Sequence, residues 1–220
     1  MDAPAHPRVK ICGLTNLEDA QLATELGAWA LGLIFYEPSP RRCTVTEGQR
    51  ITAALRRKAE LCGVFVNATL DEIDERVEQL GLTMLQLHGD EGPSFCAEAA
   101  RRTGAKVAKA ARVRSAGDVR GLEAFPTDFH MVDGYAQDLY GGTGQQVDWA
   151  IVRQRRSDVP LILSGGLTPD NVTEAIEVVR PFAVDTASGT EAEPGRKDPA
   201  KLRAFFDAVR ASAPEPQHVS

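Results

Sequence analysis

The sequence has no apolar run long enough to cross a membrane. Its longest apolar stretch, 28–36, falls well short of the ~18 residues that a membrane-spanning helix needs. Residues 1–8 contain Asp2, Pro4 and Pro7 and lack the apolar segment of a secretory signal peptide. We therefore expect no membrane partner, a flexible N-terminus over 1–8 and a cytoplasmic location.

Cysteine and histidine are too few and too scattered to suggest a disulfide framework or a metal site. The cysteines form no C-x-x-C pair, and the histidines lack the spacing of metal ligands: Cys12, Cys43, Cys62, Cys96, His6, His88, His130 and His218. A chain of 220 residues can build its core without disulfides. We therefore expect free thiols and no metal.

The sequence also has fewer basic than acidic residues. The chain has 25 Lys and Arg against 31 Asp and Glu, a net charge of -6. Nucleic-acid binding normally uses a clustered basic excess, so no nucleic-acid partner is expected. A local site for a small anion stays compatible with this composition.

What the sequence does have is a regular alternation of short apolar runs with amphipathic stretches of helical period. The predicted strands are 9–13, 28–36, 61–67, 83–88, 106–112, 129–133, 160–164 and 182–185. The predicted helices are 16–26, 46–58, 69–80, 92–103, 115–122, 148–155, 169–179 and 198–211. Because a helix separates each pair of strands, neighbouring strands are expected to be parallel.

This alternation predicts an α/β fold, a single (βα)8 TIM barrel with a closed parallel sheet over 9–211. An open doubly wound sheet is the alternative, but the turn after the first strand lacks a G-x-G-x-x-G fingerprint. Residues 212–220 are expected to be a disordered tail. Basic residues near the helix ends are expected to be solvated on the lower face: Arg56, Arg57, Lys58, Arg101, Arg102, Arg155, Arg156 and Arg180.

In such a barrel the active site lies at the carboxyl ends of the strands. Three glycine-rich turns follow the last three predicted strands, where backbone N–H groups can approach one anion. The residues expected to bind a phosphate there are Gly142, Gly144, Ser164, Gly165, Gly166, Ser188 and Gly189. A lone glycine pair is normally a tight turn, whereas three such turns at one rim favour a phosphate site.

Cys12 and Asp133 end the first and sixth predicted strands, so they can face each other across a bound ligand. Lys10 shares the inward face with Cys12, and its ammonium would favour the thiolate. Asp133 is expected to be desolvated, which would raise its pKa and suit it to protonate a substrate. The two residues are therefore an acid–base pair, although a buried apolar cysteine and a loop-capping aspartate are the ordinary alternatives.

Three further side chains are candidates for substrate binding. Arg41 offers a planar fork for a carboxylate. His88 either donates to a ligand oxygen or bonds the backbone, and the second role is expected. Asp185 points inward next to the first strand, so an ion pair with Lys10 is expected.

Together these residues resemble the phosphoribosylanthranilate isomerase family, from residue 9 to about 209. The similar segments are 9–15 (VKICGLT), 63–67 (GVFVN), 86–89 (QLHG), Asp133 with 140–144 (YGGTG), Asp148 with Trp149, 163–167 (LSGGL) and 180–185 (RPFAVD). The order and spacing of these segments make the resemblance specific.

The resemblance implies an Amadori rearrangement of N-(5'-phosphoribosyl)anthranilate to 1-(o-carboxyphenylamino)-1-deoxyribulose 5-phosphate in tryptophan biosynthesis, with no cofactor and no obligate protein partner. Asp133 matches the family's general acid and Cys12 its general base. Arg41 matches the arginine that holds the anthranilate carboxylate, and the late glycine-rich turns match the phosphate site. Arg42-Cys43 and Gly134-Tyr135 depart from the family pattern near the expected ring site.

Two other functions stay open at this stage. One is a histidine-pathway or bifunctional aldose–ketose isomerase, a sister family that has an aspartate where Cys12 stands. The other is a non-catalytic phosphosugar-binding barrel, because a fold alone does not prove activity. A metal-dependent pentose-phosphate epimerase is disfavoured, since the four histidines lack ligand spacing.

Overall fold

The computed structural model describes residues 6–134 and 148–212, and within them parallel strands form a closed barrel. The strands are β1 (Arg8–Cys12), β2 (Ala30–Ile34), β3 (Glu60–Phe65), β4 (Met84–Leu87), β5 (Lys106–Val113), β6 (Phe129–Gly134), β7 (Leu161–Leu163) and β8 (Ala183–Thr186). Each strand pairs with the next in the sequence, and β8 closes the ring on β1. The predicted barrel is confirmed, and the open-sheet alternative is wrong.

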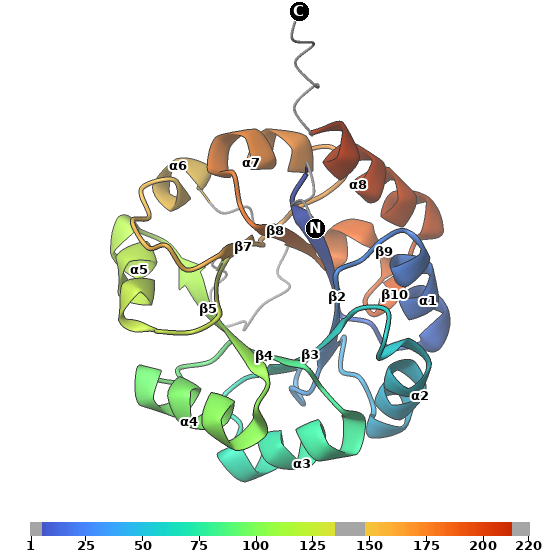
Figure 1. Cartoon of the computed structure of the whole chain (residues 1–220). Coiled ribbons are helices and arrows are strands. Elements are labelled where there is room, and N and C mark those ends of the chain that lie inside the picture. The colour runs from blue at the N-terminus through green and yellow to red at the C-terminus, as the bar shows by residue number, and fades with distance from the viewer. Residues whose placement is uncertain (1–5, 135–147, 213–220) are drawn as a thin grey trace, which may run out of the picture.

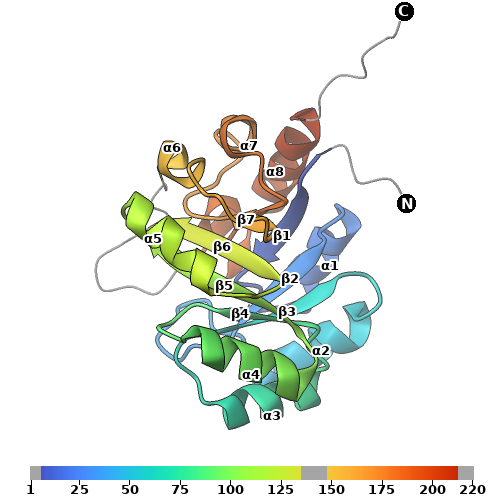
Figure 2. The same ribbon diagram turned by 60° about the vertical axis from the view of Figure 1, so that its left-hand side comes forward.

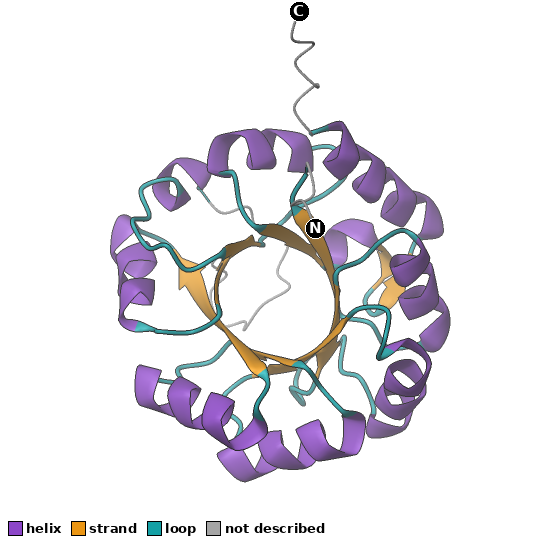
Figure 3. Ribbon diagram, in the orientation of Figure 1, coloured by secondary structure: helices purple, strands orange, loops and turns teal. Residues whose placement is uncertain are grey.

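Helices surround this ring, as Figure 1 shows along the barrel axis and Figure 3 shows by secondary structure. The helices are α1 (Leu17–Glu25), α2 (Val45–Leu55), α3 (Leu70–Leu80), α4 (Pro93–Thr103), α5 (Ala116–Gly121), α6 (Trp149–Val152), α7 (Val172–Val179) and α8 (Pro199–Ala211). A short 3-10 helix, η1 (Leu122–Ala124), follows α5. Every predicted helix is present, but α6 and α7 are shorter than predicted.

Local sequence signals explain where the helices begin and end. In five helices the side chain of the N-terminal cap residue accepts a hydrogen bond from a backbone N–H of the first turn. These accepting caps are Asn16, Thr44, Thr69, Asp148 and Asp198. α3 and α4 end at Gly81 and Gly104, which are both left-handed. These caps define where the helices that carry them begin or end.

The alternation along each strand separates two apolar layers. In β1, Val9 and Ile11 face the surrounding helices, whereas Cys12 belongs to the cluster inside the barrel with Cys62 and Met131. Figure 2 shows β5 and β6 side by side, with α4 and α5 on their outer side. The inward faces of the strands therefore determine which side chains reach the rim.

Three aromatic rings lie at the amino ends of the strands. Trp29 lies 5.4 Å from Phe129 and 5.4 Å from Phe182, measured between ring centroids. The Arg8 guanidinium carbon lies 5.2 Å from the centroid of Phe182. This cluster covers the lower end of the barrel, opposite the expected active-site rim.

Arg155 differs from the other basic residues expected in solvent on the lower face. Those others are exposed: Arg56, Arg57, Lys58, Arg101, Arg102, Arg156 and Arg180. Arg155 is half-buried; it donates to the carbonyl of Val159 and lies 3.2 Å from Nδ1 of the buried His130. The prediction for Arg155 is wrong because its guanidinium packs against the buried His130 and bonds the Val159 carbonyl.

An antiparallel hairpin follows β8 and was not predicted. It consists of β9 (Glu191–Glu193) and β10 (Arg196–Lys197) and comes after the 3-10 helix η2 (Ser188–Thr190). The Lys197 N–H donates to Oδ2 of Asp19 in α1 at 2.9 Å, which fixes the hairpin beside that helix (Figure 1). The hairpin adds polar residues behind the rim between β8 and β1.

The described elements run from Arg8 to Ala211. Residues 1–5 and 213–220, which belong to the predicted flexible ends, lie outside the described residues, as do Gly142 and Gly144. Within the described ranges, no helix has both the length and the apolar character needed to span a bilayer.

Candidate active site

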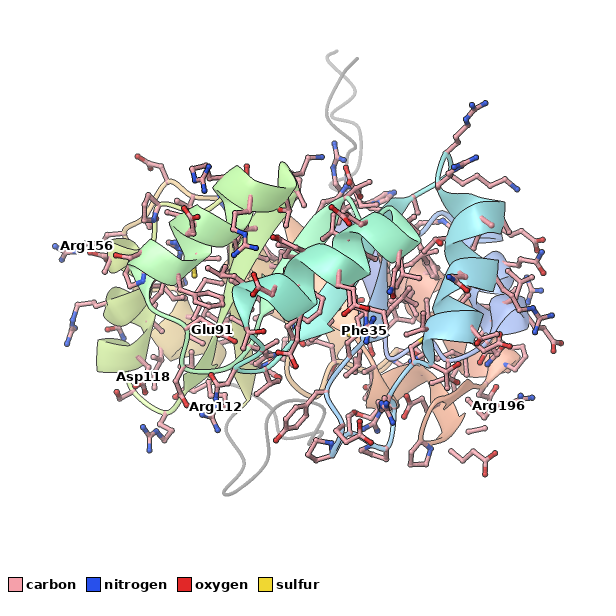
Figure 4. All side chains as sticks on the ribbon, turned by 90° about the horizontal axis from the view of Figure 1, so that it is seen from below. Phe35, Glu91, Arg112, Asp118, Arg156 and Arg196 are labelled. Carbon is pink, nitrogen blue, oxygen red and sulfur yellow. The ribbon has the colours of Figure 1, made fainter. Side chains whose placement is uncertain are left out.

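A pocket of about 670 Å³ opens at the carboxyl ends of the strands. Its lining residues come from β1, β2, β3, β4, β6 and β8, and from the loops after β2, β7 and β8. All ten described residues predicted for the site line this pocket: Cys12, Arg41, His88, Asp133, Ser164, Gly165, Gly166, Asp185, Ser188 and Gly189. Figure 4 shows Arg112, at the end of β5, and Arg196 of the hairpin on the same side of the molecule.

Cys12 lies at the end of β1 with 5% of its surface exposed. Its partner in register on β2 is Gly32, and a Cβ atom there would lie 2.7 Å from the Cys12 Sγ. Burial raises the pKa of the thiol by more than the Lys10 charge lowers it. Lys10 favours the thiolate, as expected, but desolvation outweighs its effect, so the thiol is harder to ionise than an ordinary cysteine.

Asp133 ends β6 with 6% of its surface exposed, which confirms the predicted burial. Its Oδ1 accepts the N–H of Gly134 at 2.8 Å, and its Oδ2 lies 3.4 Å from Nε2 of His88. The effect of this burial on acid strength stays a prediction.

His88 follows β4, and its side chain faces two polar partners. Nδ1 of His88 lies 2.9 Å from Nε2 of Gln86. The other ring nitrogen, Nε2, lies 3.4 Å from Oδ2 of Asp133. The expected bond from His88 to the backbone is wrong, because both ring nitrogens face side chains at the rim.

The predicted pair of Lys10 and Asp185 is confirmed. Nζ of Lys10, which is fully buried, lies 2.6 Å from Oδ1 of Asp185, and the two residues are partners in register between β1 and β8. Burial is the largest single influence and would lower the pKa of Lys10, but Asp185, Cys12 and Cys62 together outweigh it and the pKa is raised. Oδ2 of Asp185 accepts the Ser164 hydroxyl at 2.9 Å. This chain of contacts orients a hydroxyl and a carboxylate that both line the pocket.

Arg41 lies in the loop after β2, and its guanidinium meets a carboxylate of this chain. Nε donates to the two oxygens of Glu191 at 2.9 and 3.0 Å, and Nη2 donates to Oε2 at 2.8 Å. Glu191 thus contacts one edge of the guanidinium while the side chain lines the pocket. Binding of a substrate carboxylate by Arg41 stays a prediction.

The two described glycine-rich turns approach the pocket closely. Gly165 and Gly166 have φ values of +93° and +65°, and a Cβ at Gly165 would overlap the backbone nitrogen of Gly134. A Cβ at Gly189 would overlap the carbonyl oxygen of Leu167. Gly189 therefore lets the turns after β7 and β8 pack together, and Gly165 lets the turn after β7 approach β6.

The sequence analysis missed several residues at or behind the site. The apolar ones lie on two sides of the pocket: Ile34, Val64 and Val66 lie in or just after β2 and β3, and Leu167 lies in the turn after β7. Gln86 could have been found, because it lies two residues before His88 on the same inward face of β4. Glu191 and Lys197, which are buried behind Arg41, gave no such signal because charged residues after a turn are usually solvated.

The ionisable residues of the described ranges include no cluster of three or more His, Cys, Asp or Glu side chains placed to hold a metal ion. The four cysteines are free thiols, as predicted. The expectation that neither a metal nor a cofactor takes part stays a prediction.

Comparison with known proteins gives the family of this chain. The family model described as N-(5'-phosphoribosyl)anthranilate (PRA) isomerase matches residues 9–208. The chain belongs to this family. As a member it is an isomerase of tryptophan biosynthesis, which decides against the non-catalytic alternative.

Individual relatives agree with the family. The N-(5'-phosphoribosyl)anthranilate isomerase of Geobacter metallireducens is 43% identical over 204 residues, which cover 93% of this chain and 99% of that protein. The enzyme of the same name from Pseudomonas fluorescens is 45% identical over 205 residues, with 92% and 98% covered.

Solved structures agree as well. The phosphoribosyl anthranilate isomerase of Thermotoga maritima matches with a TM-score of 0.83 and 38% identity, over 93% of this chain and 99% of that one. A structure of the isomerase in complex with reduced 1-(o-carboxyphenylamino)-1-deoxyribulose 5-phosphate matches with a TM-score of 0.80 and 37% identity, again over 93% and 99%.

Proposed function

We propose that this chain converts N-(5'-phosphoribosyl)anthranilate to 1-(o-carboxyphenylamino)-1-deoxyribulose 5-phosphate with Asp133 as general acid and Cys12 as general base. The observation that carries this proposal is that both side chains line one pocket from β6 and β1. These strands lie on opposite sides of the closed ring, so a ligand between them meets both groups.

In the first step the carboxyl group of Asp133 would give its proton to the ring oxygen of the ribose. The bond from C1' to that oxygen breaks, and the nitrogen lone pair forms the protonated Schiff base. Asp133 is buried and lines the pocket, so its carboxyl group can reach a bound substrate. His88 faces the same carboxyl group and would hold it toward the pocket.

In the second step Cys12, as thiolate, would remove the proton from C2'. The C–H electron pair forms the C1'–C2' double bond, and the electrons of the C=N bond return to nitrogen. The resulting enolamine becomes the ketose when C1' gains a proton and the 2'-hydroxyl loses one. Because burial raises the pKa of Cys12, only a fraction of the chains would carry the thiolate at neutral pH.

The two anionic ends of the substrate would be bound at separate places. The apolar wall formed by the neighbouring residues Ile34 and Val64 suits the aromatic ring, and Arg41 would meet its carboxylate. The turns with Gly165, Gly166, Ser188 and Gly189 would bind the phosphate, together with the loop that contains Gly142 and Gly144. We propose no metal, cofactor or obligate protein partner, and a cytoplasmic site of action, where phosphorylated intermediates are retained.

The loss of substrate fluorescence tests the proposal directly. Wild type, Cys12→Ser and Asp133→Asn are compared with freshly generated phosphoribosylanthranilate. Each variant is expected to be slower by ~100- to 10,000-fold, the range for a lost general acid or base. A variant that matches wild type would remove that residue from the mechanism, and inert wild type that still binds ribose 5-phosphate would contradict the proposed reaction.

A further inference from the structure

The hairpin behind Arg41 contains a buried carboxylate between two cations. Glu191 and Lys197 are 6% and 5% exposed. Oε1 of Glu191 accepts from Arg41 Nε at 2.9 Å and lies 3.4 Å from Nζ of Lys197. We call Arg41, Glu191 and Lys197 the charge chain; it has two positive charges and one negative charge.

The charge chain spans two parts of the rim that would bind opposite ends of a ligand. Arg41 comes from the loop after β2 and lines the pocket. At the other end, Nζ of Lys197 donates to the carbonyl of Ala187 at 2.8 Å. Ala187 immediately precedes Ser188 and Gly189, which line the pocket as well. A displacement of Glu191 or Lys197 would therefore alter the spacing between the Arg41 guanidinium and this turn.

Other contacts hold the hairpin in place. The Lys197 N–H donates to Asp19 in α1 at 2.9 Å, and the Thr15 hydroxyl donates to the carbonyl of Gly195 at 2.6 Å. The Gly195 N–H donates to Oε1 of Glu191 at 3.3 Å. The Glu191 carboxylate is thus fixed from the backbone as well as from the two cations.

Stability alone is a poor explanation for the charge chain. Buried ion pairs lose most of their attraction to desolvation, and apolar residues of similar size are often as stabilising. Burial lowers the pKa of Lys197 although Glu191 acts in the opposite direction, and the charge of Lys197 in turn lowers the pKa of Cys12.

We propose that Glu191 and Lys197 are positioning residues that hold Arg41 and the turn at Ala187 at the spacing required by a ligand with a carboxylate at one end and a phosphate at the other. This inference rests on the proposed function, because it takes Arg41 as the carboxylate partner. It adds two residues that act through others and do not touch the reacting atoms.

The positioning role proposed for Glu191 is tested by measuring the affinity of two ligands by isothermal titration calorimetry. One ligand is reduced 1-(o-carboxyphenylamino)-1-deoxyribulose 5-phosphate, and the other is the same compound with an unsubstituted phenylamino group. Glu191→Gln is expected to weaken the first by about tenfold or more, the effect of a weakened charged contact, and the second by less than about threefold. Equal losses for both ligands would overturn the inference, because a general distortion of the pocket does not distinguish them.

Lys197 is tested with ribose 5-phosphate, which has no carboxylate. Lys197→Met is expected to weaken this ligand by about tenfold, whereas Lys197→Arg keeps the charge and is expected to restore most of the affinity. Unchanged binding by Lys197→Met would overturn the role assigned to Lys197. Lys201→Met is the matched control, because Nζ of the exposed Lys201 donates to the backbone carbonyl of Glu191 and not to its carboxylate.

Thermal unfolding of each variant accompanies these measurements. If Glu191→Gln does not fold, Glu191→Asp is measured in its place. It is also expected to weaken binding of the carboxylated ligand more than binding of the ligand without the carboxylate. Wild type that binds neither aryl ligand would overturn the proposed function and this inference together. Wild type that binds and isomerises, with equal losses in the Glu191 variant, would overturn only this inference.

Discussion

At the scale of single residues, the chemistry depends on a thiol that is harder to ionise than usual. Burial of Cys12 raises its pKa although Lys10 acts in the opposite direction. A base must be deprotonated to accept a proton, so kcat/KM is expected to rise with pH beyond the ordinary cysteine pKa of about 8.5. The rise of kcat/KM at alkaline pH should follow the ionisation of Cys12 and of no other group.

The variant Cys12→Asp tests this assignment. A carboxylate with an ordinary pKa of about 3.9 is ionised at neutral pH even when burial raises that pKa by a few units. The variant is therefore expected to keep partial activity, with the rising limb of its pH–rate profile moved to lower pH. A rising limb at the wild-type position would show that another group is the base.

Gly32 is expected to be necessary for the position of the thiol. In Gly32→Ala the new Cβ would lie 2.7 Å from the Cys12 Sγ, so the thiol must move. A displacement of this kind is expected to lower kcat/KM on the order of 100-fold. Gly92→Ala is the control, because nothing lies within 4 Å of its added Cβ. Equal rates for the two variants would contradict the geometry at Cys12.

At the scale of elements, another buried ion pair holds the loops after β3 and β4. Nζ of Lys109 in β5 lies 2.7 Å from Oε2 of Glu91, and the two Glu91 oxygens accept the N–H groups of Asn67 and Gly89 at 2.8 and 2.9 Å. Glu91 lies in the loop between β4 and α4 and is labelled in Figure 4. Gly89 follows His88, so this pair keeps the histidine beside Asp133.

Breaking this pair is expected to be costly. Lys109→Met leaves the Glu91 carboxylate buried without its cation and is expected to lower the free energy of unfolding by about 3–5 kcal/mol. The double variant Glu91→Gln, Lys109→Met should lose clearly less than the sum of the two single variants. Urea unfolding measures all three, and strictly additive losses would mean that the two side chains do not interact.

The elements also show what the sequence can and cannot predict. Period and helix caps place every barrel strand to within a few residues, because a strand buried on both faces must be apolar. The β9–β10 hairpin escaped prediction because Glu191, Glu193, Arg196 and Lys197 break any apolar alternation. Their burial depends on contacts with Arg41 and Asp19, which are distant in the sequence and become visible only in the fold.

The candidate site also has residues that the sequence could predict and properties that it could not. Cys12, Asp133 and the glycine turns could be predicted because strand ends meet at one rim of a barrel. The ionisation of Cys12 could not, because the balance between desolvation and Lys10 depends on how deeply the thiol is buried. The partners of His88 required the side-chain positions of Gln86 and Asp133.

At the scale of the whole molecule, stability and activity belong to opposite ends of the barrel. The aromatic cluster of Trp29, Phe129 and Phe182 covers the amino ends of the strands, whereas the pocket opens at the carboxyl ends. Trp29→Ala is expected to lower the free energy of unfolding by roughly 3 kcal/mol and to leave KM within about twofold of wild type. A large rise in KM with unchanged stability would contradict this separation.

The central claim is that Asp133 opens the sugar ring and Cys12 then removes the C2' proton. The decay of substrate fluorescence in a single turnover is measured for Cys12→Ser and Asp133→Asn. Each variant is given substrate with hydrogen or with deuterium at C2'. The account predicts a large primary isotope effect in Cys12→Ser, where C–H cleavage limits the rate, and almost none in Asp133→Asn, where ring opening limits it. The reverse pattern, or equal isotope effects in the two variants, would contradict the assigned roles.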